Sequence, residues 1–258
     1  MEEKRKKTGM RKRRVRRRGK KDRRQQILLR VLSVVIVVSA VLLVGSFALQ
    51  KWKNRALQAE PVDSENEAVE GDIDWFGAPE IDVELLTVNP YSRPGIALKA
   101  VKGIVVHYTA NPGSSAVANR NYFEKLKDSQ DTKVSSHFVV GLEGEIIQCI
   151  PTKEIAYASN NRNTDTLSIE CCHPDETGEF TEDTYDSLVQ LTAWLCKRFS
   201  LEKDDVIRHY DVTGKDCPRY FVQNEDAWEQ FKEDVQTTKN EIISEEQQEK
   251  KLLKRRKK

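Results

Sequence analysis

Two histidines and one cysteine have the residue types and positions of a catalytic zinc site. His107 and His209 each lie at or near the end of an apolar run of strand length, and Cys217 follows eight residues after the second histidine. Catalytic zinc sites use three protein ligands and keep the fourth position for water. A lone histidine at such a place is more often structural, and the chain has no compact metal motif such as HExxH. Both interpretations therefore stay open on spacing alone.

Short apolar runs predict the strands that position these side chains. Residues 103–109 (GIVVHYT) and 167–172 (LSIECC) have the composition of buried strands. Residues 137–150 (HFVVGLEGEIIQCI) contain two apolar runs around a Leu-Glu-Gly turn, which is the pattern of a hairpin. A short strand is expected at 206–209 (VIRH), before an irregular turn that carries Cys217.

Two helices complete the expected domain. In residues 181–199 seven side chains recur at helical spacing and form one stripe, which is typical of core packing. They are Tyr185, Leu188, Val189, Thr192, Leu195, Cys196 and Phe199. A last helix is predicted around Trp228, Phe231 and Val235. This alternation predicts an α/β fold, a central mixed β-sheet flanked by helices, with the zinc site at the sheet edge.

The charge of the chain is divided between its first 30 residues and the remainder. Residues 1–30 carry 16 Lys and Arg against 3 Asp and Glu, whereas residues 31–258 carry 27 against 38. Residues 31–49 (VLSVVIVVSAVLLVGSFAL) are uncharged and close to the ~20 residues that a helix needs to cross a bilayer. Because Lys and Arg collect on the cytoplasmic side, we expect a basic cytoplasmic arm at 1–30, a single transmembrane helix at 31–49 and an extracytoplasmic remainder.

Two other interpretations of the N-terminal segment compete with a membrane anchor. A basic arm can bind nucleic acid, but an arm next to a span lies against anionic lipid, so no nucleic-acid partner is expected. A secretory signal would be cleaved near small residues such as Ser46 and Ala48 and would release the protein. The long basic region and the long apolar stretch favour retention in the cell membrane.

Composition divides the remainder into three parts. Residues 50–85 are rich in Glu, Asp, Ala and Asn, show little apolar periodicity, and are expected to form an acidic stalk. Residues 86–235 have the alternating pattern of a folded domain. Residues 236–258, which end KKLLKRRKK, are predicted to be a charged tail, either a solvated helix or disordered. The sequence carries no signal of an oligomeric state.

Four separated segments resemble the successive signatures of the zinc-dependent N-acetylmuramoyl-L-alanine amidases. The family includes phage endolysins and animal peptidoglycan recognition proteins. The segments are VVHYTANPG around His107, SSHFVV around His137, LSIECC around Glu170 and RHYDVTGKDCPRY, which contains His209 and Cys217. They occur in the family's order, and the resemblance extends from about residue 89 to residue 235. Agreement at four places is more specific than agreement at any one of them.

The resemblance implies roles for five residues. The family's two histidine ligands fall on His107 and His209, and its third ligand, which is Cys or Asp among relatives, falls on Cys217. The acid that some bacterial and phage members carry on the central strand falls on Glu170, and the family lysine falls on Lys215. Relatives that lack one of the last two often bind without cutting, so the presence of both favours an enzyme.

The implied reaction is hydrolysis of the amide between N-acetylmuramic acid and L-alanine in bacterial peptidoglycan. Zn²⁺ lowers the pKa of a bound water to about 7 and polarises the carbonyl. Glu170 is expected to take a proton from this water and to deliver it to the leaving L-alanine amine. Lys215 is expected to stabilise the oxyanion of the tetrahedral intermediate. Ser136 stands where some relatives have a tyrosine. A mechanism assisted by that tyrosine is therefore not expected, and proton transfer is assigned to Glu170.

The expected partners are the glycan strand with its stem peptide and, through the single span, the membrane. Two alternatives stay open for the activity. One is a peptidoglycan-binding receptor or scaffold of the same fold that does not cut. The other is a zinc peptidase that acts within the stem peptide.

The remaining histidines and cysteines have other expected roles. His137, in an apolar run, is predicted to be a core or supporting histidine, and His173, before a proline, is predicted to lie at the surface. The five cysteines are an odd number on the side of the membrane where disulfides form. With Cys217 as a ligand, a disulfide between Cys149 and one of residues 171–172 and a set of buried free thiols are alternatives.

Overall fold

Six strands form a mixed β-sheet in the computed structural model, which describes residues 74–256. The strands are β1 (Asp82–Val83), β2 (Ile104–Tyr108), β3 (Phe138–Val140), β4 (Ile146–Gln148), β5 (Leu167–Cys171) and β6 (Val206–Arg208). Their order across the sheet is β1-β4-β3-β5-β2-β6. In this described sheet β3 and β4 pair antiparallel and the other neighbours pair parallel. The predicted mixed sheet and its hairpin are confirmed.

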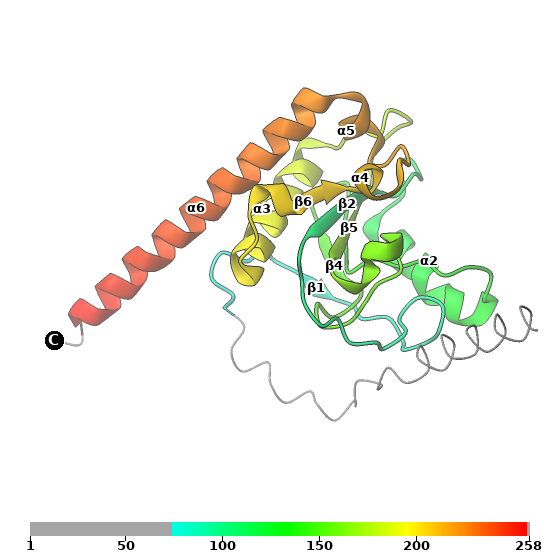
Figure 1. The fold of residues 1–258 in the computed structure, drawn as a ribbon, viewed down its shortest axis with the longest axis horizontal. Coiled ribbons are helices and arrows are strands. Elements are labelled where there is room, and N and C mark those ends of the chain that lie inside the picture. The colour runs from blue at the N-terminus through cyan, green and yellow to red at the C-terminus, as the bar shows by residue number, and fades with distance from the viewer. Residues whose placement is uncertain (1–73, 257–258) are drawn as a thin grey trace, which may run out of the picture. The chain divides into compact units, whose positions relative to one another are not determined.

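Helices cover both faces of the sheet (Figure 1). The described helices are α2 (Ala116–Ser129), α3 (Glu182–Phe199), α4 (His209–Thr213), α5 (Arg219–Gln223) and α6 (Glu225–Arg256), with 3-10 turns η1 (Asn160–Thr164) and η2 (Lys203–Asp205). The predicted helix at 181–199 is α3, which Thr181 caps by accepting a hydrogen bond from the backbone N of Thr184. Helix α2 was not predicted, because polar and charged residues separate its few apolar positions.

Alternate residues of the central strands face opposite sides of the sheet. On one side Val106 and Ile169 pack in a core that includes α3 and α6, whereas on the other side Val139 packs in a core that includes α2. His107 and Glu170 are register partners in the parallel pair of β2 and β5. Along their strands His107 follows Val106, and Glu170 follows Ile169. Their side chains therefore lie together on the α2 face.

Part of the segment that was predicted to be a stalk belongs to the folded domain. The ring of Trp75 stacks on Trp194 of α3 with centroids 5.3 Å apart, and Lys197 binds Asp74 Oδ2 at 2.9 Å. The predicted boundary at residue 85 is therefore wrong. The sequence concealed it because both side chains of β1 are exposed and leave no apolar pattern.

The basic arm at 1–30, the span at 31–49 and the first part of the stalk lie outside the described residues. Among residues 74–256, the structure contains no helix with the length and apolar character needed to cross a bilayer.

The predicted charged tail begins inside α6. The tail was predicted to be either a solvated helix or disordered. The structure shows a helix that continues to Arg256. Lys239 and Ile242 are buried, and Lys239 Nζ donates to the carbonyl oxygen of Leu201 at 2.6 Å. The first part of the tail is thus packed, which the surrounding charged residues hid. The last turns, red in Figure 1, carry exposed leucines such as Leu252.

Glu124 connects α2 to the segment that follows β1. Thr87 donates to its carboxylate from the backbone N at 3.0 Å and from Oγ1 at 2.7 Å, and Lys127 forms an ion pair with it. Burial opposes ionisation, but these hydrogen bonds and the lysine charge prevail and lower the pKa of Glu124 to about 2. Because the folded pKa lies below the ordinary 4.5, this carboxylate stabilises the fold above about pH 4.5, and that stability is lost as the pH falls toward 2.

We predict that Glu124→Gln lowers the free energy of unfolding by about 1 kcal/mol at neutral pH, a value discounted for solvent screening. The difference from wild type should narrow as the pH falls from 4.5 toward 2. Urea unfolding of the full-length protein at several pH values measures it, with the exposed Glu143→Gln as a control of the same chemistry. A variant as stable as wild type at neutral pH would contradict the role of Glu124.

Candidate metal centre

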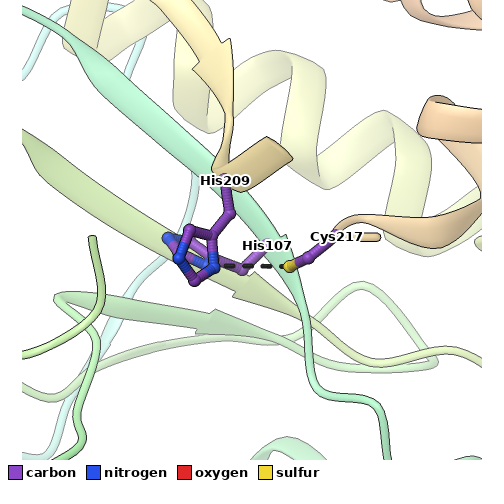
Figure 2. A group of neighbouring side chains, drawn as sticks. All are labelled: His107, His209 and Cys217. Atoms are coloured by element: carbon purple, nitrogen blue, oxygen red, sulfur yellow. Dashed lines mark hydrogen bonds between the residues drawn. The ribbon is translucent and has the colours of Figure 1, made fainter. Parts of the chain in front are cut away.

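The three candidate ligands come from separate segments and meet at the carboxyl ends of parallel strands. His107 lies on β2, His209 is the first residue of α4 directly after β6, and Cys217 lies in the loop between α4 and α5 (Figure 2). Because β2 and β6 are parallel neighbours, both histidines reach the same edge of the sheet. One ligand atom from each residue lies within 4.8 Å of the others. The structure thus brings the predicted ligands together.

After α4 the chain reverses tightly, and this reversal brings Cys217 back toward His209. Gly214 ends α4 with φ of +75°, a left-handed conformation that glycine adopts without a Cβ penalty. The backbone N of Tyr210 then donates to the carbonyl oxygen of Cys217 at 2.9 Å. The spacing of eight residues between His209 and Cys217 therefore corresponds to one short helix and one reversal.

The donor atoms have the chemistry that zinc requires. His107 Nδ1 lies 3.8 Å from Cys217 Sγ, and the two histidine rings are 4.6 Å apart. All three side chains are buried, and Nδ1 of His209 has no hydrogen-bond partner. Buried polar atoms are rarely left unpaired, and a cation bound at this nitrogen would pair it. Two imidazoles and one thiol also match the ligand set of catalytic zinc sites.

Burial sets the protonation of the three candidate ligands. It lowers the pKa of His107 well below its ordinary value, and the charges of His209 and Lys215 add to the effect. Burial and Lys215 also lower the pKa of His209, so both imidazoles are neutral and have a free lone pair at neutral pH. Burial raises the pKa of Cys217 to about 12, with Glu170 contributing. A metal ion that binds here must therefore displace the thiol proton.

The two predicted catalytic residues lie at the same centre. Glu170 Oε1 is 4.0 Å from His107 Nδ1, and Glu170 Oε2 is buried without a hydrogen-bond partner. Burial raises the pKa of Glu170 to about 8, and Lys215 opposes this shift. A carboxyl group whose pKa lies near the working pH is suited to proton transfer. Lys215 is exposed and lines the cavity from the turn before Cys217.

One cavity of about 180 Å³ is lined by all five residues. Its remaining wall includes Asn119, Tyr122 and Phe123 of α2, followed by Val134. The ring of Tyr122 is half exposed. The wall residues on α2 were not predicted, because polar and charged residues separate the few apolar positions of this helix.

The other two histidines lie outside the ligand cluster. His137 is buried and donates from Nε2 to the carbonyl oxygen of Glu154 at 2.9 Å, which confirms the prediction of a core histidine. The prediction that His173 lies at the surface is wrong. This side chain is 1% exposed, donates from Nδ1 to the carbonyl oxygen of Asp175 and packs against the ring of Tyr108. Its position before a proline did not reveal that the ring turns inward.

All five cysteines are free and buried. Of the two alternatives that the sequence left open, the structure therefore has buried thiols and no bond from Cys149 to residues 171–172. Burial raises the pKa of Cys149, Cys172 and Cys196 to about 12, so these thiols stay protonated.

Comparison with known proteins shows which proteins this domain resembles. Residues 97–220 match the family described as N-acetylmuramoyl-L-alanine amidase. The chain is 38% identical over 160 residues to a probable N-acetylmuramoyl-L-alanine amidase of Bacillus licheniformis, across 57% of this chain and 45% of that protein. It is 34% identical over 171 residues to the amidase BlyA of Bacillus subtilis (strain 168), across 58% of this chain and 45% of that protein. The chain thus spans less than half the length of these curated relatives.

Solved structures agree with the sequence matches. The catalytic domain of XlyA has a TM-score of 0.52 and 28% identity, across 61% of this chain and 99% of that one. A mutant endolysin from Bacillus subtilis has a TM-score of 0.52 and 29% identity, across 60% of this chain and 98% of that one. Sequence and structure comparisons thus support an amidase or endolysin domain, with the family match at residues 97–220.

We predict that Cys217→Ala weakens zinc binding by more than about 100-fold, because losing even an outer partner of a ligand costs about 10- to 100-fold. Cys217→Asp should keep measurable binding, since a carboxylate is also a zinc ligand. The measurement is bound zinc per chain after dialysis against a weak chelator. Cys196→Ala, which removes an equally buried thiol on α3, is the matched control. Equal zinc content in Cys217→Ala and wild type would exclude Cys217 as a ligand.

Proposed function

We propose that this protein is a membrane-anchored, zinc-dependent amidase that cleaves the bond between N-acetylmuramic acid and L-alanine in bacterial peptidoglycan. The observation that carries the proposal is the meeting of His107, His209, Cys217, Glu170 and Lys215 in one cavity. The class of the domain supports the choice of substrate, because the similar proteins are named as amidases and endolysins.

His107, His209 and Cys217 are the residues that would hold the metal. A bound Zn²⁺ supplies Lewis acidity, which makes water a stronger acid and a carbonyl carbon a stronger electrophile. An amide needs both kinds of help, since its carbonyl is a poor electrophile and its amine a poor leaving group. The unpaired Nδ1 of His209 supports this assignment.

Glu170 is proposed to carry the proton between the attacking water and the leaving amine of L-alanine. Its unpaired Oε2 is free to accept and to donate, and its raised pKa means that one proton is gained or lost near neutral pH. The neighbouring Lys215 can donate to the oxyanion that develops on the substrate carbonyl. A carboxyl group suits proton transfer and an ammonium group suits stabilisation of an oxyanion, so the residue types match the two proposed roles.

The proposed location is the outer face of the cell membrane, with the N-terminus in the cytoplasm. The support is the uncharged run at 31–49 directly after the basic residues 1–30. A short anchor and acidic stalk would confine cleavage to wall near the cell's own membrane. A secreted form, produced by cleavage after the same apolar run, is the alternative.

Protease added to intact protoplasts that express the full-length protein tests this topology. We predict that the amidase domain is digested while an N-terminal fragment stays in the membrane fraction. An epitope at the N-terminus should become accessible only after the protoplasts are lysed. Recovery of the whole domain in the medium would instead establish the secreted form.

Digestion of purified peptidoglycan by the full-length protein tests the activity. With zinc, we predict intact stem peptides that carry free L-alanine amino termini, identified by mass, and no product with a chelator. Truncated peptides would show a peptidase, and binding without products would show a receptor or scaffold. Either result contradicts the proposed amidase.

We predict that Glu170→Gln lowers kcat by at least about 100-fold, within the usual range for the loss of a general acid–base residue. Its zinc content should equal that of wild type, because Glu170 is not assigned as a ligand. The exposed Glu143→Gln serves as the control. A Glu170→Gln variant as active as wild type would rule out the proton-transfer role.

A further inference from the structure

Both candidate histidine ligands contact adjacent residues of one loop through Nε2. His107 Nε2 lies 3.2 Å from Ser159 Oγ, and His209 Nε2 lies 3.2 Å from Asn160 Oδ1. Ser159 precedes η1 and Asn160 begins it, in the connection between β4 and β5. Neither residue contributes to the reaction as described above.

This loop is held in a defined conformation. Oδ1 of Asn163 accepts hydrogen bonds from the backbone N of Ala158 at 3.1 Å and of Ser159 at 2.6 Å. Ser159 is 1% exposed. Asn160 has a φ of +53°, a left-handed conformation that asparagine tolerates better than most residues with a side chain. The loop therefore holds Ser159 in a buried position and places the exposed Asn160 with its carboxamide oxygen against His209.

The contact to Asn160 selects one tautomer of His209, and the contact to Ser159 is compatible with the same tautomer of His107. A carboxamide oxygen only accepts, so His209 donates from Nε2 and carries its lone pair on Nδ1. That Nδ1 is the buried atom without a partner. In His107, Nε2 faces the Ser159 hydroxyl, which can accept, while Nδ1 faces Cys217 Sγ at 3.8 Å. In these tautomers the lone pair of both rings is on Nδ1, which faces Cys217 in His107 and has no partner in His209.

We propose that Ser159 and Asn160 are positioning residues that hold His107 and His209 in their Nε2–H tautomers, so that both Nδ1 atoms face one metal ion. The inference rests on the proposed zinc site and adds the residues that orient it. Outer partners of this kind fix the ring and raise the basicity of the ligand nitrogen. A loop that only packed against the rings would stabilise the fold without selecting a tautomer, so the tautomer distinguishes the two roles.

Nitrogen-15 NMR of the metal-free, full-length protein labelled at histidine observes the tautomers directly. The chain has only four histidines, and His173, which donates from Nδ1, provides an internal reference of the opposite tautomer. At about pH 8, above the ordinary histidine pKa, we expect a proton on Nε2 of His107 and His209. In Asn160→Gly, His209 should become a mixture of tautomers while His107 stays unchanged. Glycine adopts positive φ freely, so this variant removes the carboxamide without straining the loop.

Two further variants serve as controls for the NMR measurement. Asn160→Asp keeps an oxygen acceptor and should keep the Nε2–H tautomer of His209. Asn161→Gly alters the exposed neighbour in the same loop and should leave all four rings as in wild type. A proton on Nδ1 of either candidate ligand in wild type, or an unchanged His209 in Asn160→Gly, would overturn the inference.

Zinc affinity, measured by competition with a chromophoric chelator, tests the consequence for the metal. Ser159→Ala and Asn160→Gly should each bind Zn²⁺ about tenfold more weakly than wild type, at the lower end of the range for outer partners. Asn160→Asp should bind at least as tightly as wild type, and Asn161→Gly equally. If wild type binds zinc and both weakening variants match it, only the positioning role fails. If wild type binds no zinc, the proposed metal site fails as well.

Discussion

The proposed chemistry depends on the burial of three candidate metal ligands near the carboxyl ends of β2 and β6. Two neutral imidazoles and a protonated thiol lie within 4.8 Å of one another, and one of their nitrogens lacks any hydrogen bond. Burying such a cluster costs free energy, because each polar atom loses its hydrogen bonds to water and must find another partner. A cation shared by the three side chains would compensate for that loss. The parallel pairing of β2 with its neighbours and the reversal at Gly214 are what bring these atoms together.

The same burial gives the centre its proposed reactivity. Loss of water keeps the histidines neutral and raises the pKa of Glu170, while the charge of Lys215 opposes the shift of Glu170. Each feature suits the proposed hydrolase. The neutral histidines have lone pairs for a metal, the Glu170 carboxyl can exchange a proton near neutral pH, and Lys215 can stabilise developing negative charge. Residues of α2 line the same cavity.

The sequence predicted the parts of this structure that leave a local pattern. Alternating or continuous apolar runs predicted the central strands and α3. Four spaced motifs predicted five candidate site residues, which line one cavity: His107, Glu170, Lys215, His209 and Cys217. Three kinds of feature had no such pattern. Helix α2 buries only four side chains among polar ones, β1 is exposed on both faces, and the burial of His173 depends on contacts from a separate strand. Ser159 and Asn160 act through single hydrogen bonds across about 50 residues, which no periodicity records.

X-ray absorption at the zinc edge of the zinc-loaded, full-length protein tests the central claim most directly. The account predicts one sulfur at about 2.3 Å, two imidazole nitrogens at about 2.0–2.1 Å and one further light atom from solvent. A shell without sulfur, or one in which a fourth protein side chain replaces the solvent atom, would contradict it.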